Sequence, residues 1–418
     1  MERRGYLLAW GMGDDLKLLD GVGRSCPARY SGYVGLGVSQ VINLDNNATT
    51  PPSRAAAEAA TEALKSTYGN PASAHAGGDA ARTLLNNARR DVAELLGCEA
   101  EQLLFTGSGT EANNLALHSL AANGLWRLVT SSVEHSSVLQ HADYLKTRGL
   151  DVVRAHVGID GRVDLDDVEA ALQGVDRPAL SVQWVNNETG VIQPIKELVA
   201  AARRCGAPVH IDAAQAVGKI EVDIKSFDPD LLTCTAHKIN GVRGVGALYA
   251  RDPWMITPLR FGGTQEKGLH PGTENLVGIA AFGAAAKERL RCLPVALEHM
   301  RRLRDAFESC VLDGCPWAEV NGVREARVCN TTNIRFTGID GQALMARLDG
   351  EGVCCSQSSA CTSQKPEPSY VLRAMGFSEL EAYESVRFST GVSNTEEEVV
   401  QAAGAVVSVA NQLRRLFA

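Results

Sequence analysis

The chain has 418 residues, which is too long for a single ordinary core, so two or three domains are expected. Its hydrophobic fraction of 45% and charged fraction of 22% are typical of a soluble globular protein. The formal net charge of −8 argues against a nucleic-acid partner and against binding to an anionic membrane surface. No apolar run approaches the ~20 residues that a membrane-spanning helix needs.

The eleven cysteines are scattered, odd in number and placed mostly inside helical or strand-like patterns. This distribution favours reduced thiols in a cytoplasmic protein over a disulfide framework. No Cys-x-x-Cys pair and no zinc-type spacing occurs, so no metal site is expected. Residues 1–40 are rich in glycine, and their apolar stretch is too short for a signal peptide. They are interpreted as an N-terminal extension of unknown order.

From residue 53 onward, apolar strand patterns alternate with helical ones. Helices are expected at 53–66 and 79–96, and a strand at 102–106 leads into a helix that runs through 120. Further strands at 125–131, 152–156, 179–185, 209–212 and 231–235 alternate with helices at 137–149, 165–172 and 195–205. This alternation predicts an α/β fold whose sheet is mainly parallel and covered by helices.

After this region the pattern changes. A long helix is expected from 282 to 310, followed by strands at 332–336 and 385–389. Helices at 341–348 and 395–416 complete the chain. This mixture is typical of a smaller α+β domain.

Lys238 lies between two apolar, strand-like runs within residues 231–251. A buried lysine cation is costly, but a lysine that forms a Schiff base loses that charge or delocalises it. An acidic residue elsewhere could partner a pyridinium nitrogen, which is the electronic requirement of pyridoxal phosphate. The alternative is an ordinary surface lysine in a hairpin.

Other polar residues follow the ends of predicted strands, where ligands bind in open α/β sheets. Gly109 and Thr110 open a helix after a strand and could hold a phosphate on main-chain N–H groups. Asp212 could pair with a pyridinium nitrogen, or it could simply cap the next helix. His135 could stack on a cofactor ring and move protons, or it could be a loop histidine.

Two more residues complete this set. Gln215 could reach a ring hydroxyl, and Asn187 also follows a strand.

The stretch 354–363 is a second polar cluster. It contains three cysteines among small polar residues, which predicts an exposed loop where a thiol is open to catalysis or sulfur transfer. Arg387 lies in a strand-like run and could bind a carboxylate through two hydrogen bonds. A structural ion pair is the alternative for Arg387.

From residue 42 onward, about nine-tenths of the chain resembles the cysteine desulfurases of the class-V aminotransferase group, in the NifS/IscS-type rather than the SufS-type form. The resemblance rests on motifs that occur in the family's order: 44–51, 69–73, 110–114, 185–190, 210–215, 237–238, 271–275, 359–363 and 367–373.

The resemblance implies a fold-type-I transferase that depends on pyridoxal 5'-phosphate. It implies a seven-stranded sheet in a large cofactor-binding domain at 53–290. A small domain, formed by 41–52 and 291–418, would carry the cysteine loop.

The resemblance also implies individual roles. Lys238 would bind the cofactor covalently and move the substrate Cα proton, while His135 would stack on the ring and Asp212 would pair with its nitrogen. Cys361 would take sulfur from L-cysteine as a persulfide and release L-alanine.

The remaining roles concern binding. Gln215 and Asn187 would approach the ring oxygen, and Arg387, with Asn187 nearby, would bind the substrate. The phosphate would be held by Gly109, Thr110, Thr235, His237 and a partner subunit's Thr273. As partners the resemblance implies a second copy in a homodimer, and sulfur acceptors of the iron–sulfur scaffold or tRNA-thiolation type.

Four positions depart from the family pattern: Val242, Ser358, Lys267 and His270. They place loop dynamics, dimer contacts and partner choice in question, but not the chemistry. A selenocysteine lyase and a non-catalytic sulfur-relay paralogue are the alternative functions. Cys354 and Cys355 could offer a second thiol, or they could be small residues at the end of a strand.

Overall fold

The computed structural model describes residues 18–19, 25–26, 41–357 and 367–417. Within the N-terminal extension it describes two short strands, β1 (Leu18–Leu19) and β2 (Ser25–Cys26), which pair antiparallel. The rest of the expectation for residues 1–40 lies outside the described residues.

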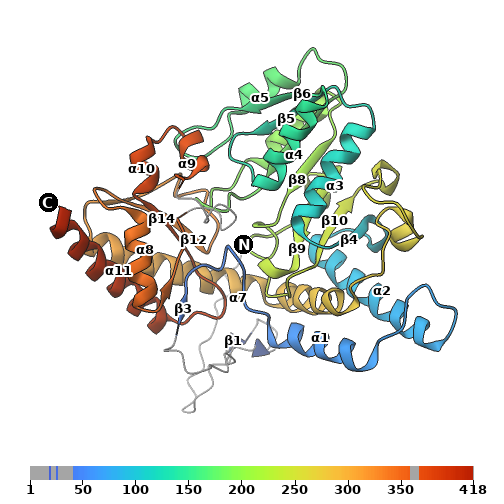
Figure 1. The fold of residues 1–418 in the computed structure, drawn as a ribbon, viewed down its shortest axis with the longest axis horizontal. Helices are drawn as coiled ribbons and strands as arrows, with labels where there is room; N and C mark the ends of the chain where they lie inside the picture. The colour runs from blue at the N-terminus through green and yellow to red at the C-terminus, as the bar shows by residue number, and fades with distance from the viewer. Residues whose placement is uncertain (1–17, 20–24, 27–40, 358–366, 418) are drawn as a thin grey trace, which may run out of the picture.

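A seven-stranded sheet forms the centre of the larger part of the molecule (Figure 1). Its strand order is β4 (Leu103–Thr106), β10 (Gly246–Ala250), β9 (Leu231–Thr235), β8 (Val209–Asp212), β7 (Pro178–Gln183), β5 (Arg127–Ser131) and β6 (Asp151–Ala155). β10 is antiparallel to both of its neighbours, and every other pairing is parallel. The predicted parallel α/β sheet is therefore confirmed.

Alternate side chains of each strand enter different cores, because successive residues of a strand point to opposite faces. On one face, Leu103 and Phe105 of β4 belong to the core that also contains α2 and α6. On the other face, Leu104 packs with residues of α3 and α4. The helices of this part are α1 (Arg54–Ser66), α2 (Ala76–Leu96), α3 (Gly109–Ala122), α4 (Ser136–Thr147), α5 (Leu165–Leu172) and α6 (Ile195–Arg204).

Polar caps fix where these helices begin. Ser53 accepts a hydrogen bond from the main-chain N–H of Ala56 at the start of α1. His75 accepts one from Gly78, so α2 begins three residues before the predicted Asp79. The short 3-10 helices are η1 (Ala100–Gln102), η2 (Ile224–Ser226), η3 (Ala236–Lys238), η4 (Pro253–Met255) and η5 (Gln265–Gly268).

A second hydrophobic core lies under a three-stranded antiparallel sheet. The sheet has the order β11 (Ala318–Val320), β12 (Thr331–Phe336), β14 (Ser385–Ser389), and β13 (Val353–Cys354) pairs in parallel with β3 (Ile42–Asn43). The helices that pack on this core are α8 (Gly341–Gly350) and α11 (Glu396–Phe417), whereas the buried residues of α9 (Tyr370–Ala374) and α10 (Glu379–Tyr383) belong to the core of the large sheet. Ile42 and Leu44 join this core although they precede the large sheet in sequence.

One helix, α7 (Leu276–Gly314), belongs to both cores. Its first half contributes Ile279 and Phe282 to the core of the large sheet, and its second half contributes Leu303 and Phe307 to the second core. The helix is longer at both ends than the predicted 282–310, and its earlier start is fixed by Asn275, which caps it by accepting from Gly278. It also contains Pro294.

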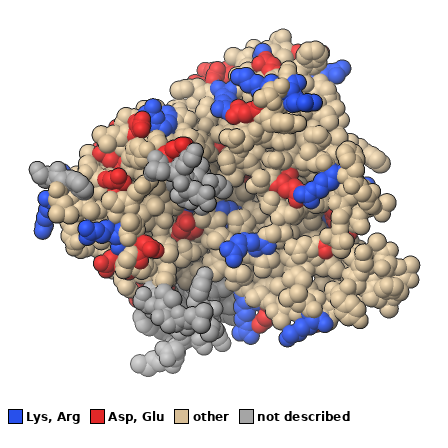
Figure 2. Space-filling model, in the orientation of Figure 1, with Lys and Arg blue, Asp and Glu red and all other residues tan. Residues whose placement is uncertain are grey.

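Eight of the described cysteines are free. Among the described residues, no helix is long and apolar enough to cross a membrane, and no cluster of three metal-binding side chains occurs. On the face drawn in Figure 2, acidic and basic side chains are interspersed.

Candidate active site

A cavity of about 240 Å³ lies at the carboxyl ends of the parallel strands. The structure brings ten of the predicted residues to its wall from segments far apart in sequence. These are Gly109, Thr110, His135, Asn187, Asp212, Gln215, Thr235, His237, Lys238 and Arg387. The placement supports one shared site, while the individual roles stay predictions.

Lys238 ends the 3-10 helix η3, directly after β9. Its ammonium donates to the main-chain oxygens of Asn47 and, at 2.9 Å, of Ala48. Both acceptors lie just after β3, in the segment that joins the second core. The segment after β3, which otherwise packs with the second core, therefore supplies the hydrogen-bond acceptors of Lys238.

Asp212, the last residue of β8, is held by two donors. Asn113 Nδ2 donates to its Oδ2 at 2.7 Å, and the main-chain N–H of Ala214 donates to its Oδ1 at 2.9 Å. Both oxygens of the carboxylate are therefore held in place. An anionic group in this cavity fits the predicted partner of a pyridinium nitrogen.

His135 follows β5 and is the N-cap residue of α4. Its Nδ1 accepts from the main-chain N–H of Ser137 at 3.2 Å and lies 2.7 Å from the Ser137 hydroxyl. Because Nδ1 is an acceptor, the neutral ring carries its proton on Nε2. Burial lowers the pKa of His135, the positive charge of Lys238 also lowers it, and Asp212 opposes the change. The ring is therefore neutral near pH 7.

The first turn of α3 meets β10 and β9 very closely. A Cβ added at Gly246 of β10 would lie 2.6 Å from the Ser108 carbonyl carbon and 2.8 Å from the Gly109 nitrogen. Ser108 caps the helix by accepting from Glu111. The first main-chain N–H groups of a helix have no partner within it, so the turn at Gly109 and Thr110 is suited to bind an anion.

Arg387 lies in β14 with 1% of its surface exposed. One guanidinium nitrogen donates to Asp45 Oδ1 at 2.6 Å and the other donates to the Asn187 main-chain oxygen at 3.0 Å. The ion-pair alternative is thus present in this structure. A carboxylate ligand would have to share the guanidinium with Asp45 or displace it.

Asn47 lies in the 44–51 motif and Asn113 in the 110–114 motif, but the sequence predicts no role for either. Asn113 lies one helical turn after Thr110, so the spacing of three residues could have placed both on one face of α3. Asn47 has no comparable local signal, since its partners are 140 or more residues away.

Thr273 does not reach this cavity within the described chain. It lines a separate cavity of about 180 Å³ together with Glu111, Arg260 and His270. Arg260 lies 2.5 Å and His270 3.1 Å from Glu111. A contribution from a partner subunit's Thr273 therefore stays a prediction.

Cys361 and Ser358 lie outside the described residues. The alternative second thiols do lie within them, and burial raises the pKa of both Cys354 and Cys355. A thiol with a raised pKa is a poor nucleophile at neutral pH. The structure therefore favours the simpler reading of these two residues as the end of a strand.

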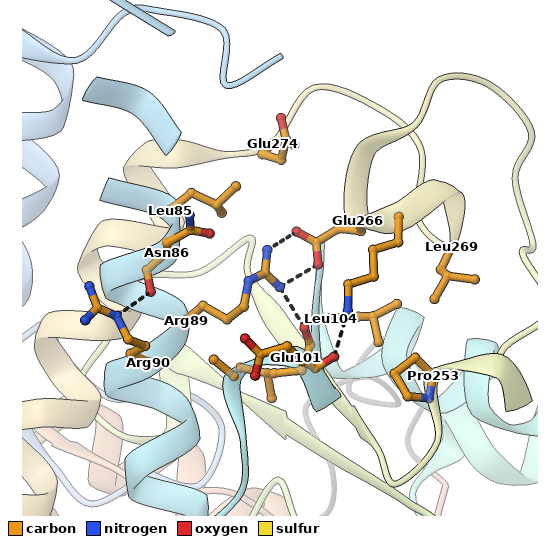
Figure 3. Close-up of a pocket in the computed structure, with 13 residues that line it drawn as sticks. Leu85, Asn86, Arg89, Arg90, Glu101, Leu104, Pro253, Glu266, Leu269 and Glu274 are labelled. Atoms are coloured by element: carbon orange, nitrogen blue, oxygen red, sulfur yellow. Dashed lines mark hydrogen bonds and ion pairs between the residues drawn. The ribbon is translucent and has the colours of Figure 1, made fainter. Parts of the chain in front are cut away.

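A larger hollow lies between α2, β4 and the 253–274 segment (Figure 3). Its main cation, Arg89, is neutralised by Glu266 through two hydrogen bonds of 2.7 and 2.5 Å. Lys267 donates to the Glu101 main-chain oxygen at 3.1 Å from a backbone with φ of 60°. Among the positions that depart from the family pattern, Lys267 therefore lines this hollow, and Val242 packs against the core of the seven-stranded sheet.

Residues 42–401 match the model of the aminotransferase class-V family. A cysteine desulfurase of Nostoc sp. is 40% identical over 378 residues, which cover 90% of this chain and 94% of that protein. The solved structure of a NifS-like protein superimposes with a TM-score of 0.83 at 31% identity, and covers 90% of this chain and 100% of that one. A structure of SspA in complex with cysteine gives a TM-score of 0.75 at 29% identity, covering 84% and 99%.

The chain belongs to the class-V aminotransferases, a family of pyridoxal phosphate enzymes, and has their fold. Within it, the chain belongs to the cysteine desulfurases, as its NifS-like relatives indicate.

The residues around the cavity fit pyridoxal phosphate. The side-chain oxygens of Asn113 and Asn187 are buried against it and have no hydrogen-bond partner among the described residues. Buried polar atoms without partners are rare. These two amide oxygens, together with the nearby lysine, carboxylate and helix N-terminus, are the groups that this cofactor would contact.

Proposed function

We propose that this enzyme removes sulfur from L-cysteine with pyridoxal phosphate held by the residues of the Lys238 cavity. The observation that carries the proposal is that Lys238, Asp212 and Arg387 surround one cavity although they come from three separate elements, η3, β8 and β14. A reactive amine, an anion for a pyridinium and a cation for a carboxylate are the groups that amino-acid chemistry on this cofactor requires.

The cofactor would supply an electron sink for the amino acid. Lys238 would hold it covalently and then exchange a proton with the substrate Cα. Asp212, kept in place by Asn113, would keep the pyridine nitrogen protonated. The first turn of α3, with Thr235 and His237, would bind the phosphate.

The substrate side of the cavity is formed by Arg387 and Asn187. Arg387 would bind the amino-acid carboxylate in place of, or together with, Asp45. The neutral His135 would cover the ring and present its Nε2–H, because its Nδ1 is bound by Ser137.

Sulfur leaves the substrate by transfer to Cys361. The thiolate of Cys361 attacks the substrate sulfur, the Cβ–S bond breaks, and Cβ takes a proton. L-Cysteine and one enzyme thiol thus give L-alanine and one enzyme persulfide, without an added oxidant. Release of sulfide from the persulfide then needs a reducing thiol or an acceptor protein.

The test is to incubate the purified chain with pyridoxal phosphate, L-cysteine and a dithiol, and to measure alanine and sulfide. We expect equal amounts of both products and visible absorbance from the bound cofactor. Cys361→Ala should keep the absorbance and lose sulfide production, whereas the control Cys354→Ala should keep both. Undiminished sulfide from Cys361→Ala would contradict the role of Cys361.

L-Selenocysteine distinguishes the alternative enzyme. A selenocysteine lyase would turn over L-selenocysteine in Cys361→Ala and leave L-cysteine unused by the unaltered chain. A colourless chain that takes up no added cofactor would instead favour the non-catalytic sulfur-relay paralogue.

The assembly and location are also proposals. We propose a homodimer in which Thr273 reaches the phosphate of the other copy, in the cytoplasm, with iron–sulfur scaffold or tRNA-thiolation proteins as acceptors. Mixing Lys238→Ala with Thr273→Ala chains tests the shared site, since a mixed dimer would regain one intact cavity. Recovery of activity supports the dimer, and no recovery from two chains shown to form mixed dimers would contradict it.

A pull-down after persulfide loading identifies the acceptors.

A further inference from the structure

Lys219 is a buried lysine that the proposed chemistry does not use. It lies after β8, with 4% of its surface exposed. Its ammonium donates to the side-chain oxygen of Gln215 and, at 2.8 Å, to the side-chain oxygen of Asn47. A buried ammonium is costly unless it is well hydrogen-bonded, so both contacts are strongly favoured.

Asn47 connects Lys219 to Lys238. The side-chain oxygen of Asn47 accepts from Lys219, while its main-chain oxygen accepts from Lys238 and, at 3.0 Å, from Gln215 Nε2. Gln215 is thus bound at both ends of its amide, with its oxygen on Lys219 and its nitrogen on Asn47. The two lysines are linked through two amide side chains.

The orientation of the Asn47 amide is fixed by further contacts. Asn330 also donates to its side-chain oxygen, at 3.1 Å. Its Nδ2 donates to Thr331 Oγ1 at 2.8 Å and to the Asn187 main-chain oxygen at 3.2 Å. With two donors on the oxygen and two acceptors on the nitrogen, the amide cannot rotate without losing all four bonds.

We propose that Lys219 is a positioning residue for the Lys238 site: it binds the side-chain oxygens of Asn47 and Gln215, and so turns the N–H ends of both amides toward the residues around the cavity. Gln215 and Asn187 line that cavity. In this arrangement a side-chain N–H donor of Gln215, and not its carbonyl oxygen, is available on the cofactor side. The inference rests on the proposed function, because it assigns Lys219 to the cofactor site.

The charges around Lys219 support this role. The charged or titratable groups that act on its pKa are Lys238, Cys329, Arg387 and Arg289, a set without a carboxylate. Burial, followed by the charge of Lys238, lowers the pKa of Lys219 well below its usual value. The amide oxygens are therefore its partners, and Lys219 in turn disfavours a positive charge on Lys238, since repulsion between two cations is mutual.

The test is Lys219→Met, which keeps the length of the side chain but has no donor. The loss frees the side-chain oxygen of Gln215 to turn toward Lys238 and removes a neighbouring cation, and both effects favour the charged form of the nitrogen on Lys238. The pH midpoint of the visible absorbance of bound pyridoxal phosphate should therefore rise by about half a pH unit or more. Lys225→Met, at an exposed lysine paired only loosely with Glu99, is the matched control and should leave the midpoint unchanged.

A second measurement needs no cofactor. Competitive acetylation of Lys238 by acetic anhydride across a pH range, quantified by peptide mass spectrometry, reports the pKa of its amine in the cofactor-free chain. Lys219→Met should raise this midpoint too. Lys219→Gln keeps an N–H donor, so its acetylation midpoint should lie between those of the unaltered chain and Lys219→Met. It also serves as the test variant if Lys219→Met does not fold.

The outcomes separate the two claims. A chain that binds no pyridoxal phosphate contradicts the proposed function, and the acetylation midpoints still decide the role of Lys219. Equal midpoints in Lys219→Met and the unaltered chain, even with a lower melting temperature, would make Lys219 a purely structural residue and overturn the inference.

Discussion

The amide of Asn113 and the carboxylate of Asp212 meet at 2.7 Å across the boundary between α3 and β8. The same amide nitrogen also donates to the Ser137 hydroxyl at 2.9 Å, and that hydroxyl lies beside His135 Nδ1. Asn113 of α3 thus links Asp212 and His135, the two residues predicted to contact the cofactor ring.

Asn113→Ala should weaken cofactor binding. A hydrogen bond to a charged group contributes about 1.5–3 kcal/mol, so the dissociation constant of pyridoxal phosphate should rise roughly tenfold or more. Absorbance titration with added cofactor measures it. Asn123→Ala, at the other end of α3, is the control: it removes the C-cap contacts of Asn123 and should lower stability without changing the affinity.

Gly246→Ala tests the close approach of β10 to the start of α3. A methyl group there would lie within 3 Å of the main chain of Ser108 and Gly109, so the helix terminus has to move. We expect weaker cofactor binding by roughly tenfold. The comparison is Gly404→Ala in α11, where a methyl group meets nothing within 4 Å, and stability should rise by about 1 kcal/mol. Unchanged cofactor affinity in Gly246→Ala would contradict the assignment of the phosphate site.

Arg387→Lys should raise KM for L-cysteine roughly tenfold while the visible absorbance persists, because lysine cannot provide two parallel hydrogen bonds to a carboxylate. Initial rates over a range of substrate concentrations measure this effect. Asp45→Asn should act in the opposite direction and lower KM, since it weakens the competing ion pair. An increase in KM for Asp45→Asn would show that Asp45 supports substrate binding.

His210 predicts a pH-dependent stability. It is fully buried between Ser181 and Thr233, and burial lowers its pKa to about 4. The unfolded chain binds a proton at this residue below about pH 6.5, while the folded chain does not until about pH 4, so its contribution to stability is lost as the pH falls through this range. The loss between pH 7 and pH 5 should be roughly 2 kcal/mol.

Glu134 acts in the opposite sense over the same range, since burial raises its pKa to about 8 and it favours the folded state at low pH. The effect of His210 is therefore isolated by comparing urea unfolding of the unaltered chain and His210→Gln at both pH values. The variant should lose less stability on acidification. Equal losses would mean that His210 is already protonated in the folded chain at pH 5.

Much of the fold could be predicted from the sequence because local patterns decide it. The predicted bounds of α5, β8, β9 and β14 agree with the structure, since polar or glycine residues end each apolar run there. The start of α7 could not be placed, because residues 276–281 are apolar and show no helical alternation. The strand order, with β10 inserted antiparallel between β4 and β9, depends on long-range pairing that has no local signal.

The candidate site divides in the same way. Lys238, Asp212, His135 and Asn187 could be identified because each follows a strand-like run. Lys219 could not, because a lysine after a glycine reads as a surface residue, and only its contact with Asn47, 172 residues earlier, shows that it is buried within the site.

Asn47 also has a consequence for the order in which the chain folds. It is made early in synthesis, but its main-chain N–H binds the Ser389 hydroxyl, and its side chain binds Asn330 and Thr331. Contacts between such distant residues form only after long loops have closed. Lys238 and Gln215 therefore acquire their acceptor at Asn47 after nearly the whole chain has left the ribosome, and tight cofactor binding would mark the last stage of folding.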